Sequence, residues 1–211
     1  MRILYHHRTR GRHVEGVHIR GIVNALRELG HQVTVMSFPG ADPEHEPAPT
    51  AQASAGKGRL AGAVAKLPGV LFEFMELAYN VVTLFRMAAA IRRLQPQLIY
   101  ERYSLFLCAT IWLARRHGIP VVLEINDSAL VERVRPLRLK RLARRIEGWC
   151  LRHCTGLVFI SSYFRDQAEA TYPQVAPSVV SPNAADLARF DPSRFDREQL
   201  REQRGLAGRV V

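Results

Sequence analysis

The sequence predicts an α/β protein with a Rossmann-like sheet, open and mostly parallel, flanked by helices. Short apolar runs alternate with segments of helical periodicity along nearly the whole chain, which is typical of a doubly wound sheet. One of these runs, residues 119–125, is apolar on both faces and rich in β-branched residues. A strand of this kind indicates a parallel sheet that is covered by helices on both sides.

The chain begins with a strand, a helix and a second strand. We expect strands at 2–6 and 32–36, because both segments are short and apolar. Residues 16–29 between them repeat apolar positions at helical spacing, and Gly30 follows where a glycine commonly ends a helix. The next segment, at about 39–66, is rich in Ala and Pro and predicts a mobile surface loop.

The rest of the chain continues the alternation of strands and helices. The expected strands are 97–101, 119–125, 156–160 and 178–181, and the expected helices are 67–93, 105–117, 138–153, about 162–170 and 197–204. Gly118 is expected to end one helix and Ser161 to cap another. Residues 208–211 resemble the start of a further strand.

The helix expected at 67–93 is apolar on more than one face. It could bind an acceptor lipid, a partner protein or a membrane. We favour a crossover helix buried on the sheet, because helices that are apolar all round are usually buried. Charged residues interrupt it before it reaches an apolar span of about 20 residues, so no transmembrane helix is expected.

The composition limits the kinds of partner. The 211 residues include 30 Lys and Arg against 19 Asp and Glu, which gives a formal net charge of +11. Such a surface favours anionic partners, namely acidic lipid, phosphate-bearing substrates or nucleic acid. Three cysteines give no disulfide framework in a chain of this length, which indicates a reducing cytosol. Cys150, His153 and Cys154 are close in sequence, but zinc would need further ligands, so no metal site is expected.

The turn before the first helix matches neither of two common nucleotide-binding loops. A dinucleotide fingerprint needs Gly-x-Gly-x-x-Gly, whereas this turn holds only Gly11 and Gly16. Their spacing is that of a Walker loop, but Val17 and His18 stand where its Lys and Ser/Thr are needed. A nicotinamide dehydrogenase and a P-loop ATPase are therefore disfavoured. Gly16 could either ease a tight turn or approach an anion at the helix N-terminus.

Polar residues appear abruptly at the carboxyl end of the 119–125 strand, as Glu124, Asn126 and Asp127. Ligands of open α/β sheets bind outside the carboxyl ends of the strands, so this exit is the candidate site. Arg102 and Tyr103 leave the preceding strand at the same edge. Glu124 either pairs with an arginine such as Arg102 or lines an open cleft, and we favour the cleft.

Three parts of the chain, read together, resemble a known family. They are residues 16–35, residues 97–102 with 118–122, and residues 157–161 with 180–190. The last part, which begins Val180-Ser181-Pro182-Asn183, resembles a Pro-Asn-Gly-x-Asp-x-x-x-Phe hinge. The chain is similar to the N-terminal half of a retaining family 4 glycosyltransferase of the GT-B type, which has two Rossmann-like domains.

The resemblance implies a transferase that moves a sugar from a nucleotide-sugar donor to a glycan or lipid-linked acceptor. It implies catalytic positions at Glu124, Asn126 and Asp127, acceptor contacts at Arg102, Tyr103 and His18, a donor-phosphate position at Gly16, and hinge positions at Asn183 and Asp186. No metal or other cofactor is implied, because in this family helix dipoles and basic side chains replace a metal ion at the diphosphate of the donor. Two residues depart from the family pattern. Asn126 replaces a histidine of many members and cannot titrate near neutral pH, and Ala184 replaces the hinge glycine.

The resemblance also divides the chain. It implies an N-terminal domain at 1–196, then a linker and the start of a donor-binding domain at 197–211, so that this chain is expected to be inactive alone. The expected localisation is cytoplasmic, peripheral on the inner membrane face through the basic helix Arg138 to His153. The alternative for that segment, which stays open, is a helix that packs on the sheet and exposes its basic face to solvent.

A non-catalytic module is the alternative function. Its charge would hold a protein partner, an acidic membrane or nucleic acid. The basic residues lack the interleaved aromatic residues of a single-strand-binding surface, and no nucleic-acid motif appears. We therefore expect no nucleic-acid partner.

Overall fold

The computed structural model describes residues 1–9, 14–37, 69–132, 136–183 and 191–206. Its centre is a parallel sheet of six strands in the order β2-β1-β3-β4-β5-β6. The strands are β1 (Arg2–His6), β2 (Gln32–Met36), β3 (Leu98–Arg102), β4 (Val121–Ile125), β5 (Gly156–Phe159) and β6 (Ser178–Val180). The predicted fold class is confirmed, and the order of the strands reverses between β1 and β3.

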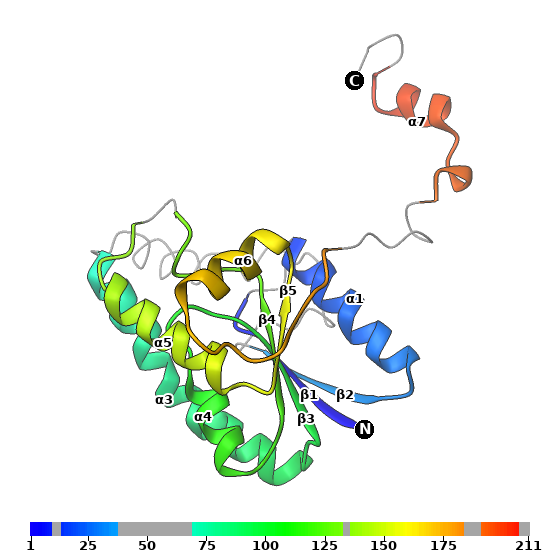
Figure 1. Ribbon diagram of the computed structural model, residues 1–211. Coiled ribbons are helices and arrows are strands. Elements are labelled where there is room, and N and C mark those ends of the chain that lie inside the picture. Colours follow the sequence, from blue (N-terminus) through cyan, green and yellow to red (C-terminus); the bar gives the residue numbers. More distant parts are fainter. Residues whose placement is uncertain (10–13, 38–68, 133–135, 184–190, 207–211) are drawn as a thin grey trace.

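Helices lie on both faces of the sheet. They are α1 (Val14–Glu28), α3 (Gly69–Leu94), α4 (Ala109–Arg116), α5 (Lys140–His153) and α6 (Ser162–Thr171), followed by a 3-10 turn, η1 (Pro192–Arg194), and α7 (Arg197–Gln203). Figure 1 shows α1 on one side of the sheet and α3, α4 and α5 on the other. The sheet is therefore a middle layer, and more of the described helices cover one face than the other.

The two faces have separate apolar cores, because side chains alternate along each strand. On one face, Ile19 and Val23 of α1 pack on Ile3, Tyr5 and Val33. The larger core on the opposite face contains Leu4, Ile99, Leu123, Leu157 and Phe159 from the strands, with Met87 and Ile91 from α3 and Cys150 and Leu151 from α5. Since α1 packs mainly against β1 and β2, the side chains of Tyr100, Val122 and Val158 on that face stay only half buried.

Two predicted helix ends are confirmed by left-handed glycines. Gly30 follows α1 with a φ of 81°, and Gly118 follows α4 with a φ of 65°. Both values lie in the region that residues with a Cβ rarely adopt. Ser161 caps α6 as expected, since its side-chain oxygen accepts a hydrogen bond from the Phe164 N–H.

The prediction of a helix over 105–117 was wrong in its first turn. The segment from Leu105 to Leu107 is buried but not helical, with Phe106 at a φ of 63°, and α4 begins only at Ala109. A residue of another helix explains the start. The Asn80 Oδ1 of α3 accepts hydrogen bonds from the N–H groups of Cys108 and Ala109 at 2.9 and 3.0 Å. Its Nδ2 donates to the Phe106 carbonyl at 2.8 Å, which fixes the turn.

The interpretation of α3 as a crossover helix buried on the sheet holds for only one side of the helix. Its buried residues, Glu73, Tyr79, Thr83, Met87 and Ile91, lie along one side only. Several large apolar residues on the helix are exposed, among them Phe74 and Phe85. In the described part of the chain, α3 is the one helix long and apolar enough to cross a membrane, and only 28% of its most apolar window is buried.

Some expectations fall outside the described residues. The predicted loop at about 39–66 and the predicted strand start at 208–211 are among them. The division into a domain at 1–196 and a linker at 197–211 stays a prediction. Helix α7, which lies in that linker, has no buried residue.

Candidate functional site

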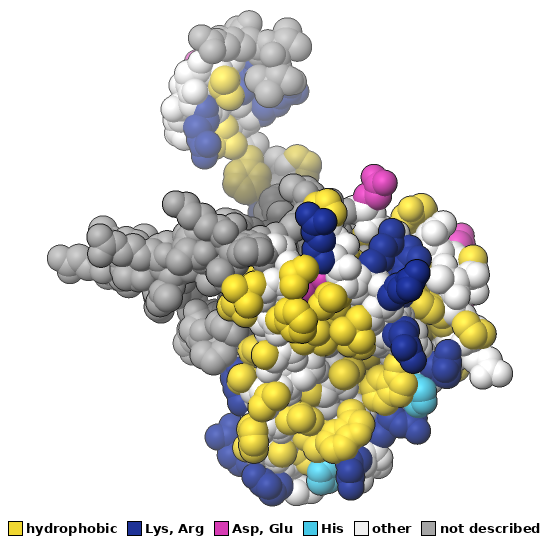
Figure 2. Space-filling model, turned by 90° about the vertical axis from the view of Figure 1, so that its left-hand side faces the viewer, with side chains coloured by type: hydrophobic (Ala, Val, Ile, Leu, Met, Phe, Trp, Pro, Cys, Tyr) yellow, Lys and Arg dark blue, Asp and Glu magenta, His cyan; other side chains and the backbone are white. Residues whose placement is uncertain are grey.

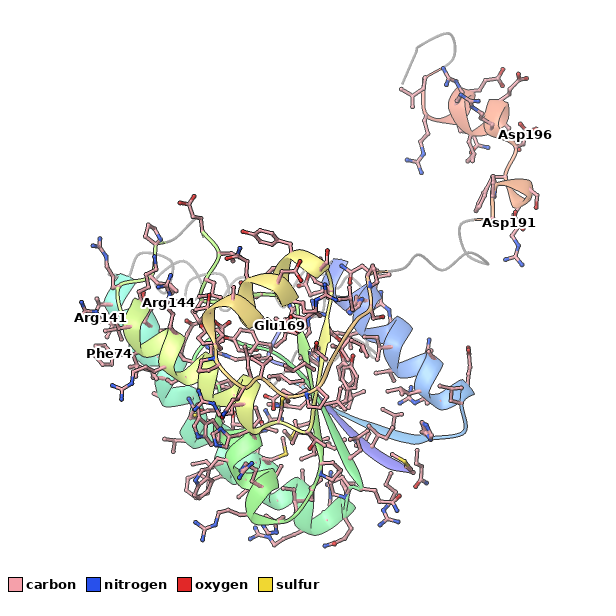
Figure 3. All side chains as sticks on the ribbon, in the orientation of Figure 1. Phe74, Arg141, Arg144, Glu169, Asp191 and Asp196 are labelled. Atoms are coloured by element: carbon pink, nitrogen blue, oxygen red, sulfur yellow. The ribbon has the colours of Figure 1, made fainter. Side chains whose placement is uncertain are left out.

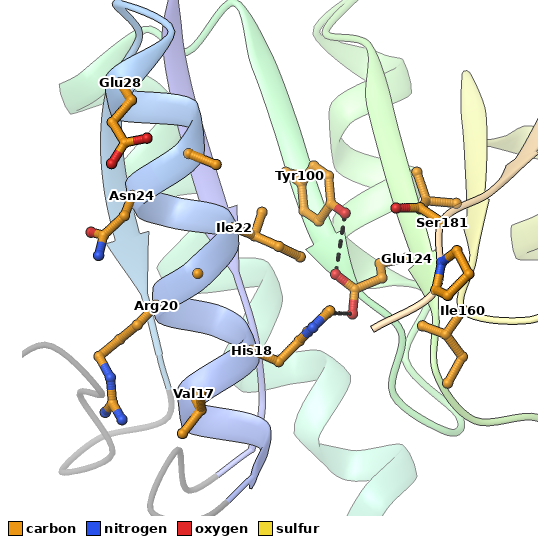
Figure 4. A pocket seen from close by; sticks show the side chains of 14 residues that line it. Val17, His18, Arg20, Ile22, Asn24, Glu28, Tyr100, Glu124, Ile160 and Ser181 are labelled. Carbon is orange, nitrogen blue, oxygen red and sulfur yellow. Dashed lines mark hydrogen bonds and ion pairs between the residues drawn. The ribbon is translucent and has the colours of Figure 1, made fainter. Parts of the chain in front are cut away.

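The main cleft of the described structure lies between α1 and the carboxyl ends of the strands. It has a volume of about 560 Å³. Its walls are Val17, His18, Arg20, Gly21, Ile22, Asn24, Ala25 and Glu28 from α1, with Tyr100, Glu124, Val158, Ile160, Ser181 and Pro182 from the strands and their exits. Figure 4 shows these side chains on the two sides of the cleft. The cleft occupies the part of the α1 face that none of the described helices covers, where open α/β sheets bind ligands.

Glu124 is the polar centre of this cleft. Its side chain is 1% exposed and accepts hydrogen bonds from three neighbours. Arg102 Nη1 lies 2.7 Å from Oε1, His18 Nε2 lies 3.0 Å from the same oxygen, and the Tyr100 hydroxyl donates to Oε2 at 3.1 Å. The pairing with Arg102 is thus formed, although the favoured interpretation was the open cleft. Glu124 nevertheless borders the cleft, so both alternatives hold in part.

The strand register explains why these groups meet. Arg102 pairs with Glu124 across β3 and β4, and Glu124 pairs with Val158 across β4 and β5. Side chains at paired positions of a parallel sheet point to the same face, and Tyr100 lies two residues before Arg102 on that face. His18 approaches from α1, which packs over this side of the sheet.

Arg102 joins Glu124 to Asn126. With the Asn126 amide oriented so that its oxygen faces the guanidinium, this oxygen accepts from Arg102 Nε at 3.2 Å and from Nη2 at 3.0 Å. This orientation is the one that satisfies both groups, since an arginine can only donate. Arg102 therefore holds the polar exit of β4 in place, and its own side chain is 10% exposed.

The tyrosines under the cleft stay protonated. Burial, followed by the charge of Glu124, raises the pKa of Tyr100 far above its usual value. The same two causes raise the pKa of Tyr5, whose ring stacks on Tyr100 at a centroid distance of 5.2 Å. A phenol with a raised pKa is a permanent hydrogen-bond donor at neutral pH. Tyr100 is thus fixed as a donor to Glu124.

Four of the residues predicted to line the cleft do not border it. Tyr103 was predicted to line the acceptor cleft, but it is 3% exposed and packs in the core on the α3 side of the sheet. The reason is alternation: Tyr103 follows Arg102, so it points to the opposite face. Asp127 does not border the cleft either, and its Oδ1 accepts from the Ser128 N–H at 2.8 Å. Arg102 and Asn126, which contact each other and join Glu124, are also outside the lining of the cleft.

The remaining predicted positions are distributed around the cleft. Gly16 is buried in the first turn of α1, and the helix begins two residues earlier than expected. The first residue of α1 that lines the cleft is Val17, directly after Gly16. Asn183 is exposed just beyond Pro182, while Asp186 lies outside the described residues. Of the residues that line the cleft, only His18 and Glu124 were predicted as site residues. The polar lining residues that were missed are Arg20, Asn24, Glu28, Tyr100 and Ser181. Tyr100 could have been found, because it shares a strand face with Arg102.

The described residues hold no cluster of three or more His, Cys, Asp or Glu side chains that could bind a metal ion. Cys150 and Cys154 are buried, and Cys150 belongs to the core under α5. The cleft itself presents one histidine and two carboxylates, those of His18, Glu124 and Glu28.

Comparison with protein families decides the affiliation. Residues 16–189 match the model of Glycosyltransferase Family 4. The chain belongs to this family. The match includes most of α1, all strands from β2 to β6 and the polar exit of β4. The comparison with curated proteins gives no match.

Solved structures confirm the fold of this family 4 domain. It is similar to sucrose-phosphate synthase from Thermosynechococcus elongatus, with a TM-score of 0.64 and 12% identity over 98% of this chain and 53% of that one. A glycosyltransferase from Rickettsia africae has a TM-score of 0.59 and 15% identity over 99% and 50% of the two chains. HepE of Anabaena, solved with UDP and glucose, has a TM-score of 0.51 and 16% identity over 98% and 51%. The chain thus spans about half the length of the structures it matches.

Proposed function

We propose that this family 4 domain is the acceptor side of a glycosyltransferase that moves a sugar from a nucleotide-sugar donor to a glycan or lipid-linked acceptor. The observation that carries the proposal is the cleft at the strand carboxyl ends, in which Glu124 is surrounded by three hydrogen-bond donors. Sugar hydroxyls are recognised by such fixed polar groups set between apolar walls.

The geometry divides the polar residues into two roles. Glu124 already accepts three hydrogen bonds and is 1% exposed, so we assign it to positioning Arg102, His18 and Tyr100. The His18 imidazole uses Nε2 for Glu124, which leaves Nδ1 to serve a substrate hydroxyl. Asn126 is half buried at the strand exit and can offer its amide in the same way.

We infer that the donor is bound together with a second domain. The comparison structures are about twice as long as this chain, and one of them was solved with UDP and glucose. On the side of this chain, the N-terminal turns of α1 and the Arg20 side chain border the cleft. A helix N-terminus and a guanidinium attract phosphate, so we propose that no metal is required. This chain alone is then inactive.

We further propose a cytoplasmic location, peripheral on the inner membrane face. Helix α5 supports this, since Lys140, Arg141 and Arg145 are all exposed on it. Basic side chains of this kind attract acidic lipid headgroups. A membrane location would bring a lipid-linked acceptor to the domain.

The test is a turnover assay with a panel of nucleotide-sugars, performed on this chain alone and on this chain joined to a donor-binding domain. We expect turnover only in the two-domain protein. His18→Ala and Glu124→Gln should lower kcat/KM by about tenfold or more, since each removes a polar contact in the cleft. The matched control is Arg93→Ala, which changes an exposed residue at the far end of α3. Full activity of both cleft variants would refute the assignment of this cleft.

A further inference from the structure

Helix α3 carries an apolar stripe on the side that faces away from the sheet. The stripe consists of exposed side chains at helical spacing, namely Val70, Leu71, Phe74, Met75, Val81, Val82 and Phe85. Phe74 is 53% exposed and Phe85 is 75% exposed. We call this set the α3 stripe. Figure 2 shows hydrophobic side chains gathered along the middle of this face of the molecule.

A contiguous stripe differs from single exposed apolar residues, which are normal on protein surfaces. Residues 70–85 span roughly 22 Å of helix at about 1.5 Å per residue. Apolar patches of this extent, when bordered by polar residues, mark interaction sites for proteins or membranes. The stripe therefore requires an occupant.

The opposite side of α3 is fixed to the domain, so the helix cannot leave it to cross a membrane. Tyr79, Met87 and Ile91 are buried on that side. Glu73 accepts hydrogen bonds from the N–H groups of Arg138 and Leu139 at 2.7 and 2.6 Å. Pulling α3 out would expose these apolar groups and leave a buried carboxylate unpaired, which is costly. Any lipid contact must be in the plane of the interface, with the helix lying flat.

The charges around the stripe indicate the chemistry of its occupant. The contacts of Glu73 place the start of α5 beside the start of α3, and Figure 3 labels Phe74 near Arg141 and Arg144. Figure 2 shows Lys and Arg side chains along the edges of the hydrophobic band. The two acidic residues of α3 do not oppose this charge, since Glu73 is buried and Glu76 pairs with Arg8 at 3.6 Å.

We propose that the α3 stripe docks on an anionic lipid bilayer, with Phe74 and Phe85 inserted at the level of the headgroups and the arginines of α5 on acidic phosphates. Aliphatic arms of arginine pack on apolar surface while the charged ends reach the polar layer. A second copy of the chain fits less well. A two-fold interface through the stripe would place the basic rims of both copies against each other.

The α3 stripe changes the expected mode of membrane contact. The basic face of α5 alone would give binding that depends on charge and disappears at high salt. The α3 stripe adds an apolar contribution that salt does not screen. The start of α3 lies at the same edge of the sheet as the cleft, because the helix runs antiparallel to the strands it connects.

Flotation with lipid vesicles tests the proposal without any measurement of turnover. The probes are phosphatidylcholine vesicles and vesicles with about 30% phosphatidylglycerol, at low and high salt. We expect the chain to float with the anionic vesicles at least ten times more strongly than with the neutral ones. Part of this binding should persist at high salt.

The variants separate the two contributions. Phe74→Ser with Phe85→Ser should lower binding to anionic vesicles about tenfold and remove the part that resists salt. Arg141→Ala with Arg145→Ala should remove the preference for anionic lipid. The matched control is Leu29→Ser with Tyr163→Ser, which changes two exposed hydrophobic residues outside α3, one in the turn after α1 and one on α6, and should leave binding unchanged. Thermal unfolding verifies that all variants are folded, as expected for exposed positions.

Three results would overturn the proposal. The first is vesicle binding by the double serine variant that equals the wild type. The second is no binding of the wild type to either vesicle. The third is a dimer in light scattering that the double serine variant turns into a monomer, with no vesicle binding by either protein. That result would assign the stripe to a second copy.

Discussion

Arg102 Nη1 lies 2.7 Å from Glu124 Oε1, and this ion pair joins two neighbouring strands beneath the cleft. Both side chains are at most 10% exposed, and the same guanidinium also contacts Asn126. The pair thus supports the polar exit of β4. Its loss would affect stability as well as the site.

We predict that Arg102→Met destabilises the fold by about 3–5 kcal/mol, because Glu124 would keep a buried charge with less compensation. Denaturant unfolding measures this free energy. The double variant Arg102→Met/Glu124→Leu should recover a large part of the loss, since no buried charge remains. The control Arg93→Met, at an exposed position, should change stability by less than about 0.5 kcal/mol. Equal stability of Arg102→Met and wild type would show that the pair contributes nothing.

A second prediction concerns Asn80, whose side chain makes four hydrogen bonds to backbone groups, three of them around the start of α4. Its Nδ2 donates to the carbonyls of Leu77 and Phe106, and its Oδ1 accepts from Cys108 and Ala109. Asn80→Leu should cost about 1–3 kcal/mol for each buried group left unpaired. The stability of Asn80→Asp should lie between that of Asn80→Leu and that of the wild type, because an aspartate still accepts the hydrogen bonds from the N–H groups of Cys108 and Ala109. The free energy of unfolding and hydrogen exchange at the amides of Cys108 and Ala109 measure the effect; unchanged exchange would contradict it.

Two glycines in helices should respond in opposite ways to alanine. A Cβ at Gly148 would lie 2.7 Å from Cδ1 of Tyr172, whose buried hydroxyl is held by Glu147. We therefore expect Gly148→Ala to destabilise by about 1–3 kcal/mol through overpacking. A Cβ at Gly21 would meet nothing within 4 Å. Gly21→Ala should stabilise α1 by about 0.5–1 kcal/mol through helix propensity. Thermal unfolding of both variants tests the contrast, which fails if the two shifts have the same sign.

The buried thiols should be inert in the folded chain. Burial raises the pKa of Cys154 to about 12, and it raises that of Cys150 as well. At pH 8, a thiol reagent should therefore leave both unmodified until denaturant is added, when all three cysteines react. Fast reaction of two or more thiols in the native protein would disprove this.

The raised pKa of Cys154 also makes the free energy of unfolding depend on pH. The folded state binds this proton more tightly than the unfolded state, whose thiol has the ordinary value of 9.0. The stability that the folded state gains from this tighter proton binding is complete below pH 9 and is lost as the pH rises towards 12. The variant Cys154→Ala should show a shallower fall of unfolding free energy over this range than the wild type. Identical slopes would exclude a contribution from this group.

Local patterns in the chain predict the α/β class and the approximate strands, because apolar periodicity and helix-ending glycines are local signals. Gly30 and Gly118 are such signals, and both have the positive φ that a helix end requires. The family was indicated separately, by the resemblance of three segments, above all residues 180–190, to family 4 glycosyltransferases. The sequence also pointed to the exit of β4, where polarity changes within three residues. These features need no knowledge of which segments meet in space.

The tertiary structure decided which polar groups share a site. Sequence order alone does not show that His18 of α1 reaches Glu124 of β4, 106 positions away. It could not separate Arg102, on the cleft face, from Tyr103, in the opposite core, until the strand register was known. It likewise could not show that α3 is covered on one side only, since burial depends on what packs against a helix. Contacts between distant segments depend on the packing of the whole domain, and local patterns in the chain do not specify them.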